Sequence, residues 1–453
     1  MAPVPPGWPL REVTTIRHRI LIVGLAAILL TGVGAVFGLH HGEPPNPGSA
    51  QAASSLTAGQ APADQLAASI ARAQKHLGVV PGDFVAWAAL GSAYIERARV
   101  SADPTYYPKA EGALRRSLKL RPTGNPAALV GLGALANARH RFATARDLAH
   151  RALRMDPYSA DAYGVLADAQ TQLGHLPAAT KAIQRMLDLR PGLAAYARAS
   201  YDLEQQGRLG AAAALMRRAL GDAVDPADIA FCRYQLGELA WRAGRLDDAK
   251  TEYAAGQTAD PAYLPLLAGR ARVAAASGHT AAALSDYAEL TARYPSPGYL
   301  MDYATLLRAT GQQKHADQQL ALAAAALRLF RANGGTDDLG VAQLALAQGH
   351  SRQAVLAAKR EWSRRHFADV ADMLGWALHR SGANAEAISY ARKADALGAR
   401  NSGYLFHLGM IELSLGRNAD AHRDLSAALA LNPHFSPLDA PAATAALHRL
   451  GPR

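Results

Sequence analysis

The sequence predicts an all-α fold, a solenoid of about ten helix–turn–helix repeats that follows one transmembrane helix. The main observation is a regular period. Eight glycines, from Gly174 to Gly416, lie 33 to 38 residues apart, and each is followed five residues later by an alanine. A repeat length near 34 residues is typical of stacked helical hairpins. Prolines also recur where the second helix of a repeat should stop, because proline cannot continue a helix.

The first repeat indicates the kind of hairpin. Its first helix contains the pattern W-x2-L-G-x2-Y at Trp87, Leu90, Gly91 and Tyr94. In this pattern, and in the period that follows it, the chain resembles the tetratricopeptide repeat family from about residue 84 to about residue 435. The resemblance implies a right-handed superhelix. It also implies that the first helix of each repeat, helix A, lines a concave face that binds peptides or extended segments.

The array divides into ten repeats between two caps. The repeats are expected to start at Phe84, Pro126, Ala160, Leu193, Ala230, Leu264, Pro297, Gly335, Ala368 and Ser402. Residues 64–83 are interpreted as a capping half-repeat and residues 436–453 as a C-terminal capping helix. His140 takes the place of the turn glycine in the second repeat. Since each repeat of such an array packs mainly on its neighbours, stability is expected to be a sum of nearest-neighbour interfaces.

A membrane anchor is predicted near the N-terminus. Residues 20–39 contain no charged side chain, and twenty helical residues span about 30 Å, the thickness of a bilayer core. Basic residues occur among residues 1–19, whereas the next one after the apolar run is Arg72. Residues 1–19 are therefore expected in the cytoplasm and the array outside it. A cleaved signal peptide is the alternative, although its apolar core usually has only about 7–15 residues. Residues 40–63, rich in Pro, Ala and Gly, are expected to form a flexible tether.

The net charge of +11 is distributed unevenly. Residues 84–222 carry a charge of +8, whereas residues 223–453 carry +2. The first half of the array is therefore expected to prefer acidic protein segments or anionic headgroups. A nucleic-acid partner is not expected, because the sequence contains no recognition motif for one. Nothing in the sequence predicts the oligomeric state.

No pattern in the sequence predicts catalysis, a cofactor or a metal ion. Gly131, Gly133 and Ala136 match G-x-G-x-x-A, but they lie inside a predicted helix rather than between a strand and a helix. The single cysteine, Cys232, is interpreted as a buried thiol without a basic partner. Several of the 16 histidines follow turn glycines of separate repeats, so they do not converge as metal ligands would. The protein is therefore not expected to be an enzyme.

The candidate binding site is the concave face, assigned by position within each repeat. In the fifth repeat the inward positions are Phe231, Tyr234, Glu238, Trp241 and Arg242. Aromatic side chains beside arginines often dominate binding energy. Inward positions of other repeats add Tyr201, Arg272, Arg308, Trp376 and Arg380. The alternative, that the aromatic side chains fill the core between repeats, stays open because apolar stripes on helices also form cores.

Two functions remain open at this point. The first is a membrane-anchored scaffold or adaptor that binds protein segments, acidic ones among them, outside the cytoplasm. The second is an assembly chaperone for exported proteins. Residues 71–122 look like the extracytoplasmic tetratricopeptide domains that hold unfolded apocytochrome during cytochrome c maturation. Co-purification of c-type apocytochromes would distinguish the second function from the first.

Overall fold

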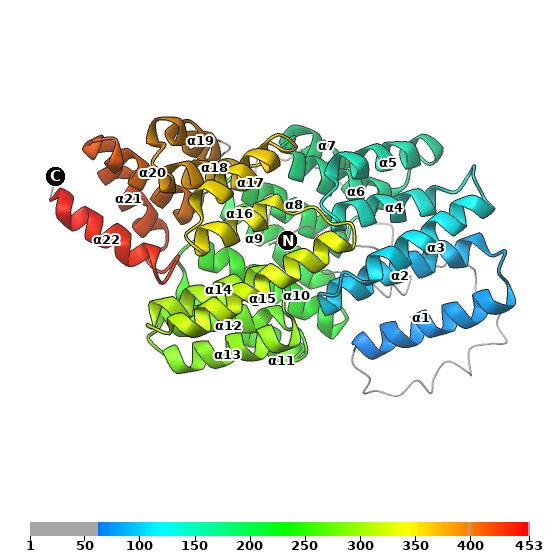
Figure 1. The fold of residues 1–453 in the computed structure, drawn as a ribbon. Coiled ribbons are helices and arrows are strands. Elements are labelled where there is room, and N and C mark those ends of the chain that lie inside the picture. The colour runs from blue at the N-terminus through cyan, green and yellow to red at the C-terminus, as the bar shows by residue number, and fades with distance from the viewer. Residues whose placement is uncertain (1–61, 397, 399, 452–453) are drawn as a thin grey trace.

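A computed structural model describes residues 62–396, 398 and 400–451, which form 22 α-helices and no β-strand. Twenty of these helices pair into ten hairpins (Figure 1). The helices A are α2 (Phe84–Ser101), α4 (Pro126–Ala138), α6 (Ala160–Leu173), α8 (Leu193–Gln205), α10 (Pro226–Arg242), α12 (Pro265–Ala276), α14 (Pro297–Ala309), α16 (Asp338–Ala347), α18 (Ala368–Arg380) and α20 (Ser402–Ser414). The second helices, helices B, are α3 (Tyr106–Leu120), α5 (Phe142–Met155), α7 (Leu176–Leu189), α9 (Leu209–Asp222), α11 (Leu246–Ala259), α13 (Thr280–Arg293), α15 (Gln313–Ala332), α17 (Ser351–Trp362), α19 (Asn384–Ala396) and α21 (Asn418–Leu431). The helix α1 (Pro62–Val79) precedes the ten hairpins, and α22 (Asp439–Leu450) follows them.

Local signals set where these helices begin and turn. The Ser159 hydroxyl caps α6 by accepting a hydrogen bond from the backbone N–H of Ala162 at 3.2 Å. Gly174 ends α6 with φ +83°, a conformation that costs glycine nothing. Inside the first hairpin, a Cβ on Gly91 would lie 2.5 Å from Cγ of Leu114. The small residue of the motif is therefore required for the close packing of helix A on helix B.

The observed hairpins have the predicted phase. Seven of the ten expected repeat starts are the first residues of helices A, namely those of α2, α4, α6, α8, α14, α18 and α20. The other three lie within four residues of α10, α12 and α16, and the first two of these begin at a proline, which is pre-organised for the first helical position. The prediction of an all-α repeat fold is confirmed for the described residues.

The predicted anchor cannot be compared with the structure. Residues 1–61, which include the apolar run 20–39 and the tether, lie outside the described residues. Among the helices that are described, none combines the length and the apolar character needed to cross a bilayer.

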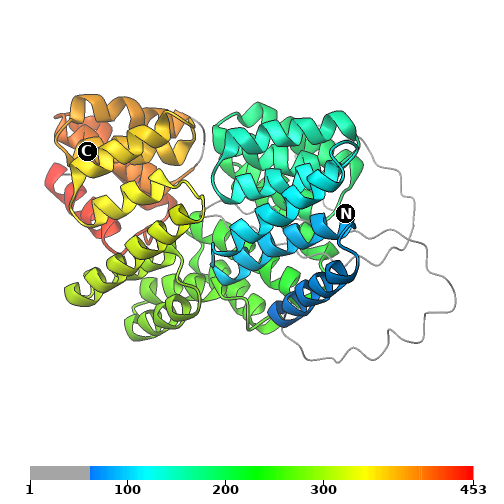
Figure 2. The same cartoon turned by 45° about the vertical axis from the view of Figure 1, so that its right-hand side comes forward.

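The array coils back on itself and forms two layers. Figure 2 shows repeats 1–5, coloured blue to green, beside a second block that runs to the red C-terminus. The two blocks meet along a line, here called the seam. On one side of the seam lie the A-to-B turns of repeats 1–5. On the other side lie the loops that leave helix B of repeats 6–10.

Backbone and side-chain contacts across the seam, most of them hydrogen bonds, join each of repeats 1–5 to the fifth repeat after it. The Tyr294 hydroxyl donates to the carbonyl oxygen of Arg99 at 2.9 Å, which joins repeats 6 and 1. The backbone N–H of Thr336 donates to the carbonyl oxygen of Arg139 at 3.0 Å, joining repeats 7 and 2. The remaining contacts pair His366 with Leu173, Gly398 with Gly207, and Asn432 with Trp241. Five successive repeats thus complete one superhelical turn.

The turn glycines show how close the two layers come. A Cβ on Gly174 would lie 2.3 Å from the carbonyl oxygen of His366, and one on Gly244 would lie 2.4 Å from that of Leu431. Such distances leave no room for a side chain. The main helix-to-helix contacts are still those between neighbouring repeats, as expected, but repeats five positions apart also share backbone contacts. The cause is the tight coil, which brings the second layer onto the first.

His140 lies at the seam, in the A-to-B turn of repeat 2, and its burial disfavours the protonated form of the imidazole. Its backbone has φ +58°, and its ring lies 5.6 Å from that of Phe142 and 5.1 Å from that of Phe330. Burial lowers the pKa of His140 below its ordinary value. The carboxylate of Asp337, 3.9 Å away, opposes this effect, whereas Arg365 reinforces it.

The seam is therefore expected to weaken in acid. A pKa that is lower in the folded state than in the unfolded state means that the folded protein binds fewer protons, so stability is lost as the pH falls below about 6.5. His140→Asn, which tolerates positive φ, should reduce the difference in melting temperature between pH 7.5 and pH 5.0. His350→Asn, at an exposed turn position, is the control. An unchanged pH dependence in His140→Asn would contradict this assignment.

Candidate functional site on the concave face

The inner surface of the superhelix is where repeats from both layers converge. Helices α8 and α10 of the first layer face α18 and α20 of the second across a narrow interior. The Glu204 carboxylate is the largest influence on Arg242 and raises its pKa, and Asp369 of α18 acts in the same direction from the opposite layer. Burial raises the pKa of the Tyr201 hydroxyl, and Asp369 and Glu204 add to this. Charged groups of the two layers therefore act on one another across the interior.

Two ion pairs occupy the wall formed by repeats 4 to 6. Nε of Arg242 lies 2.8 Å from Oε1 of Glu204, whose side chain is only 5 % exposed. Arg272 pairs with Glu238, and the Tyr253 hydroxyl donates to the same carboxylate at 2.7 Å. Hydrogen-bonded charges of this kind are held in place, because breaking the pair would leave a buried charge without compensation. The predicted residues Tyr201, Glu238, Arg242 and Arg272 do come together, but their charges are already satisfied within the chain.

The aromatic residues predicted in the fifth repeat lie in the core. Phe231 has no exposed surface, Tyr234 is 7 % exposed and Trp241 is 8 % exposed. Tyr234 packs against Tyr253 and Tyr263, and the guanidinium of Arg272 covers the Trp241 ring at 5.5 Å. For these three side chains, the alternative of core packing fits the structure better than an exposed groove.

Farther along the same wall, Arg308 and Asp302 project from α14. Arg308 donates to the carbonyl oxygen of Ala347 and lies 3.4 Å from Oδ1 of Asp317. Asp302 is reached by solvent, yet protein atoms surround it on the inside of the coil, and this partial desolvation raises its pKa to about 6. Nothing in the sequence around Asp302 indicated its place here, because the coil, not the local motif, sets its surroundings.

Repeats 9 and 10 present a half-exposed aromatic surface, which we call the ledge: Trp376, His379, Arg380 and His407. The Trp376 ring stacks on His379 at 4.8 Å and on His407 at 4.2 Å, and Arg380 lies 5.8 Å from it. Nδ1 of His407 lies 2.8 Å from Asp372. Burial lowers the pKa of His407, but the Asp372 carboxylate outweighs it and the net shift is upward. Asp372 pairs with the charge of His407, so the ledge combines an aromatic face with one exposed cation, Arg380.

The ledge contains two residues of the predicted site, Trp376 and Arg380, and two that the site prediction did not include, His379 and His407. Asp372 is the fifth residue of α18 and His407 is the sixth residue of α20, so the two lie 35 residues apart in the sequence. A spacing close to one repeat is the signal that could have joined them. Arg380 is exposed, so its guanidinium can meet a partner, unlike those of Arg242 and Arg272.

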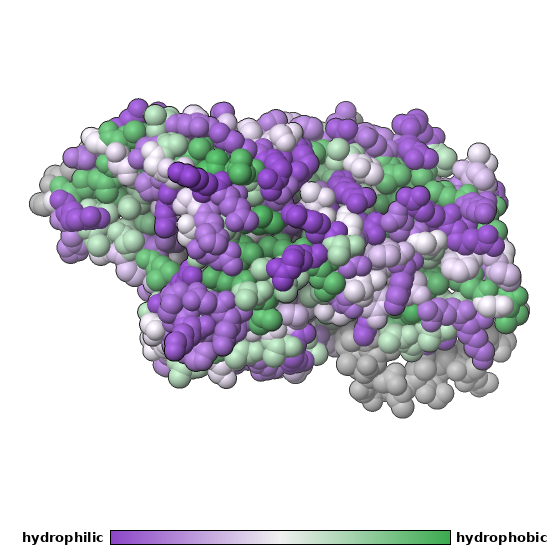
Figure 3. Space-filling view, in the orientation of Figure 1, coloured by the Kyte–Doolittle hydropathy of each residue, from purple (hydrophilic) through white to green (hydrophobic). Residues whose placement is uncertain are grey.

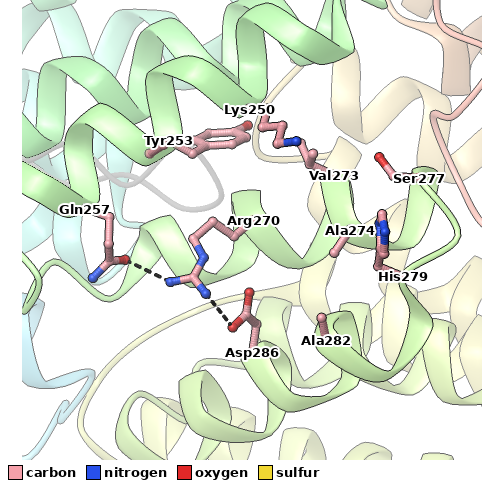
Figure 4. A pocket seen from close by; sticks show the side chains of 11 residues that line it. Lys250, Tyr253, Gln257, Arg270, Val273, Ala274, Ser277, His279, Ala282 and Asp286 are labelled. Atoms are coloured by element: carbon pink, nitrogen blue, oxygen red, sulfur yellow. Dashed lines mark hydrogen bonds and ion pairs between the residues drawn. The ribbon is translucent and has the colours of Figure 1, made fainter.

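A separate groove lies on the outer side of repeats 5 and 6. Its volume is about 440 Å³, and residues of α11, α12 and α13 line it (Figure 4). Arg270 crosses the groove, lying 3.4 Å from Oε1 of Gln257 and 3.0 Å from Oδ1 of Asp286. Three of the polar groups that line the groove, those of Gln257, Arg270 and Asp286, are thus paired with one another.

No group of three or more possible metal ligands converges among the described residues. Burial raises the pKa of the Cys232 thiol to about 12, so this cysteine is protonated at neutral pH and is a poor nucleophile.

Comparison with known proteins identifies the repeat. Residues 136–200 match the tetratricopeptide repeat family model. This segment of the chain therefore resembles tetratricopeptide repeats. It spans the second part of repeat 2, all of repeat 3 and the start of repeat 4. Among curated protein sequences, none matches this chain.

Several solved structures are similar to the chain. A tetratricopeptide repeat protein from Parabacteroides merdae has 19% identity and a TM-score of 0.35, over 57% of this chain and 98% of its own. The Cut9 and Hcn1 complex of the APC/C has 13% identity and a TM-score of 0.40, over 85% and 94%. Yeast Tom70 has 14% identity and a TM-score of 0.40, over 79% and 86%. At such identities, partners and functions do not carry over.

Proposed function

We propose that the protein is a scaffold or adaptor that binds protein segments through the ledge of repeats 9 and 10. The observation that carries this proposal is the difference between two tryptophans of the concave face. Trp241 is buried under Arg272, whereas Trp376 is half-exposed and lies beside the exposed Arg380. Tryptophan and arginine are the side chains that most often dominate binding energy at interfaces.

The charge of the ledge favours an acidic segment as partner. Arg380 stacks on Trp376, and the Asp372 carboxylate favours the protonated form of His407. A carboxylate of the partner would therefore pair with the exposed Arg380 beside the aromatic ring, while Asp372 keeps its pair with His407. This agrees with the expectation of acidic partners, although the ledge lies in the second half of the array rather than in the more basic first half.

Substitutions at the ledge are expected to reduce partner capture without unfolding the array. Trp376→Ala and Arg380→Glu should each weaken binding by about 2 kcal/mol, and Arg380→Glu should do so more strongly at low salt. A photo-crosslinking amino acid at position 380 of the full chain should capture the partner in intact membranes. The matched control is position 352, since Arg352 is an exposed arginine of α17. Equal capture at both positions, or unchanged binding in both ledge variants, would contradict the proposal.

The same experiment addresses the chaperone alternative. A scaffold should capture one or a few folded or extended partners, whereas an apoprotein holder should capture many unfolded exported chains. c-type apocytochromes among the crosslinked proteins would favour the second function. The two outcomes are distinguished by the identity of the captured proteins and not by the strength of capture.

We further propose that residues 20–39 anchor the array to a membrane with the repeats outside the cytoplasm. The long apolar run and the basic residues before it support this orientation. A reporter that is active only in the cytoplasm should be inactive when fused after Arg453 and active when fused before Met1. An active C-terminal fusion would reverse the orientation. A mature protein that starts near Ala53 would instead show that the apolar run is a cleaved signal peptide.

A further inference from the structure

Each layer of the array has one covered edge and one free edge. We call the side with the A-to-B turns the turn edge, and the side with the loops from helix B to the next helix A the loop edge. The seam joins the turn edge of repeats 1–5 to the loop edge of repeats 6–10. The loop edge of repeats 1–5 and the turn edge of repeats 6–10 remain uncovered within the described residues.

The free turn edge is built like the covered one. On the covered edge, Gly174, Gly207 and Gly244 have φ between +69° and +83°. On the free edge, five turn glycines have φ between +72° and +89°, and a Cβ on any of them would meet nothing within 4 Å; they are Gly278, Gly311, Gly349, Gly382 and Gly416. The two edges thus share one backbone shape, but only one of them is occupied.

The free loop edge exposes apolar side chains that its covered counterpart buries. Six of the ten large apolar side chains that are exposed in the described residues lie there: Val79, Val80, Val85, Met155, Tyr158 and Val224. On the covered loop edge, by contrast, Tyr294 is 5 % exposed and Phe367 is 3 % exposed, because the turns of the first layer cover them. Clustered exposed apolar residues on one edge indicate an interaction surface.

We propose that the free loop edge binds the free turn edge of a second copy of this chain and so extends the superhelix head to tail. The occupant is a second copy because the same two kinds of edge already bind each other within one chain. The contact is heterologous, so it does not close on itself and can add further copies. This proposal is independent of the ledge and of its partner.

The end helices set the register of this contact. The helix α22 follows helix B of repeat 10 and packs on α21 and α20, which places it in the helix A position of an eleventh repeat. The helix α1 precedes helix A of repeat 1 and packs on α2, in a helix B position. Continuing the superhelix leaves room for one hybrid repeat, made of α22 from one copy and α1 from the next. Val224 should then lie over the turn at Gly416 and Arg417, and Tyr158 over the turn at Gly349 and His350.

The first test is the mass of the full-length chain in solution, measured by light scattering over a range of concentrations. The mass should rise with concentration. The double substitution Tyr158→Glu and Val224→Glu should weaken association by about tenfold or more, because it puts charge into an apolar contact. Both side chains are more than 70 % exposed, so the fold should be unaffected. The matched control is Leu356→Glu, since Leu356 is 61 % exposed in the middle of α17 rather than in a turn or a loop. Figure 3 shows hydrophobic side chains at several places on one face of the molecule, so exposure alone does not define an interface.

The second test is the register. Chains carrying Val224→Cys and chains carrying Arg417→Cys should form a mixed disulfide when combined, while Val224→Cys with Gln312→Cys should not. The native Cys232 is buried and does not interfere. A monomer at all concentrations, an assembly that is insensitive to the double substitution, or crosslinking without preference for Arg417→Cys would each overturn the proposal.

Discussion

Gly174→Ala is expected to destabilise the array by about 3 kcal/mol. A residue with a Cβ loses about 1–2 kcal/mol in the left-handed conformation that Gly174 adopts at φ +83°. The Cβ would also lie 2.3 Å from the carbonyl oxygen of His366, so the second layer would have to move away. Overpacking of this kind typically costs a further 1–3 kcal/mol. The free energy of unfolding, from urea denaturation followed by circular dichroism, measures the sum.

Gly349→Ala is the matched control for this prediction. Gly349 has φ +80° in the same turn position of repeat 8, but a Cβ there would meet nothing within 4 Å. Only the conformational cost remains, about 1–2 kcal/mol as at Gly174. The difference between the two variants therefore measures the seam alone. Equal losses would mean that the layers are not held against each other in solution.

Trp241→Ala is expected to cost about 3–5 kcal/mol of stability, the usual range for a buried tryptophan. The ring is 8 % exposed and lies under Arg272, while the backbone carbonyl of Trp241 accepts a hydrogen bond from Asn432 across the seam at 2.7 Å. Removing the ring would leave a cavity beside the ion pair of Arg272 and Glu238. The melting temperature should fall whether or not a partner is present.

Trp376→Ala provides the comparison, because Trp376 has the same inward orientation but is half-exposed. Its removal should change the melting temperature much less and affect partner capture instead. If Trp241→Ala melted almost normally but lost partner binding, Trp241 would be a binding residue of an exposed groove. The recognition surface would then lie on repeats 5 to 7.

Much of the fold could be predicted because its signals are local. The period near 34 residues, the turn glycines and the prolines each act within one hairpin, so they set the hairpins and their phase. The contact between repeats five positions apart could not be predicted. It depends on the small rotation from each repeat to the next, summed over five repeats. No single residue or motif in the sequence indicates the size of that rotation.

The site prediction was limited for the same reason. Position within the repeat correctly placed Glu238, Arg242 and Arg272 together on the inner wall, but it could not show that Glu204 and Glu238 already satisfy these arginines. Likewise, the inward phase of Phe231 and Trp241 was visible in the sequence, whereas their burial follows from tight packing between neighbouring repeats and layers. The ledge differs because it lies near the end of the coil. Phe406 and His407 of repeat 10 cover part of Trp376, but no repeat five positions later follows among the described residues.

The most direct measurement of the two-layer arrangement is hydrogen exchange of the loop amides at the seam. The N–H of Thr336 bonds to the carbonyl oxygen of Arg139 in the other layer, and the N–H of His366 bonds to that of Leu173. If the layers are joined, peptides that cover 334–337 and 365–368 should exchange slowly, and Gly174→Ala should speed the exchange of the second peptide. The equivalent loop of the first layer, around the exposed Val224, should exchange rapidly in both proteins. Rapid exchange of all three loops in the unmodified chain would show that the array is an open solenoid without a seam.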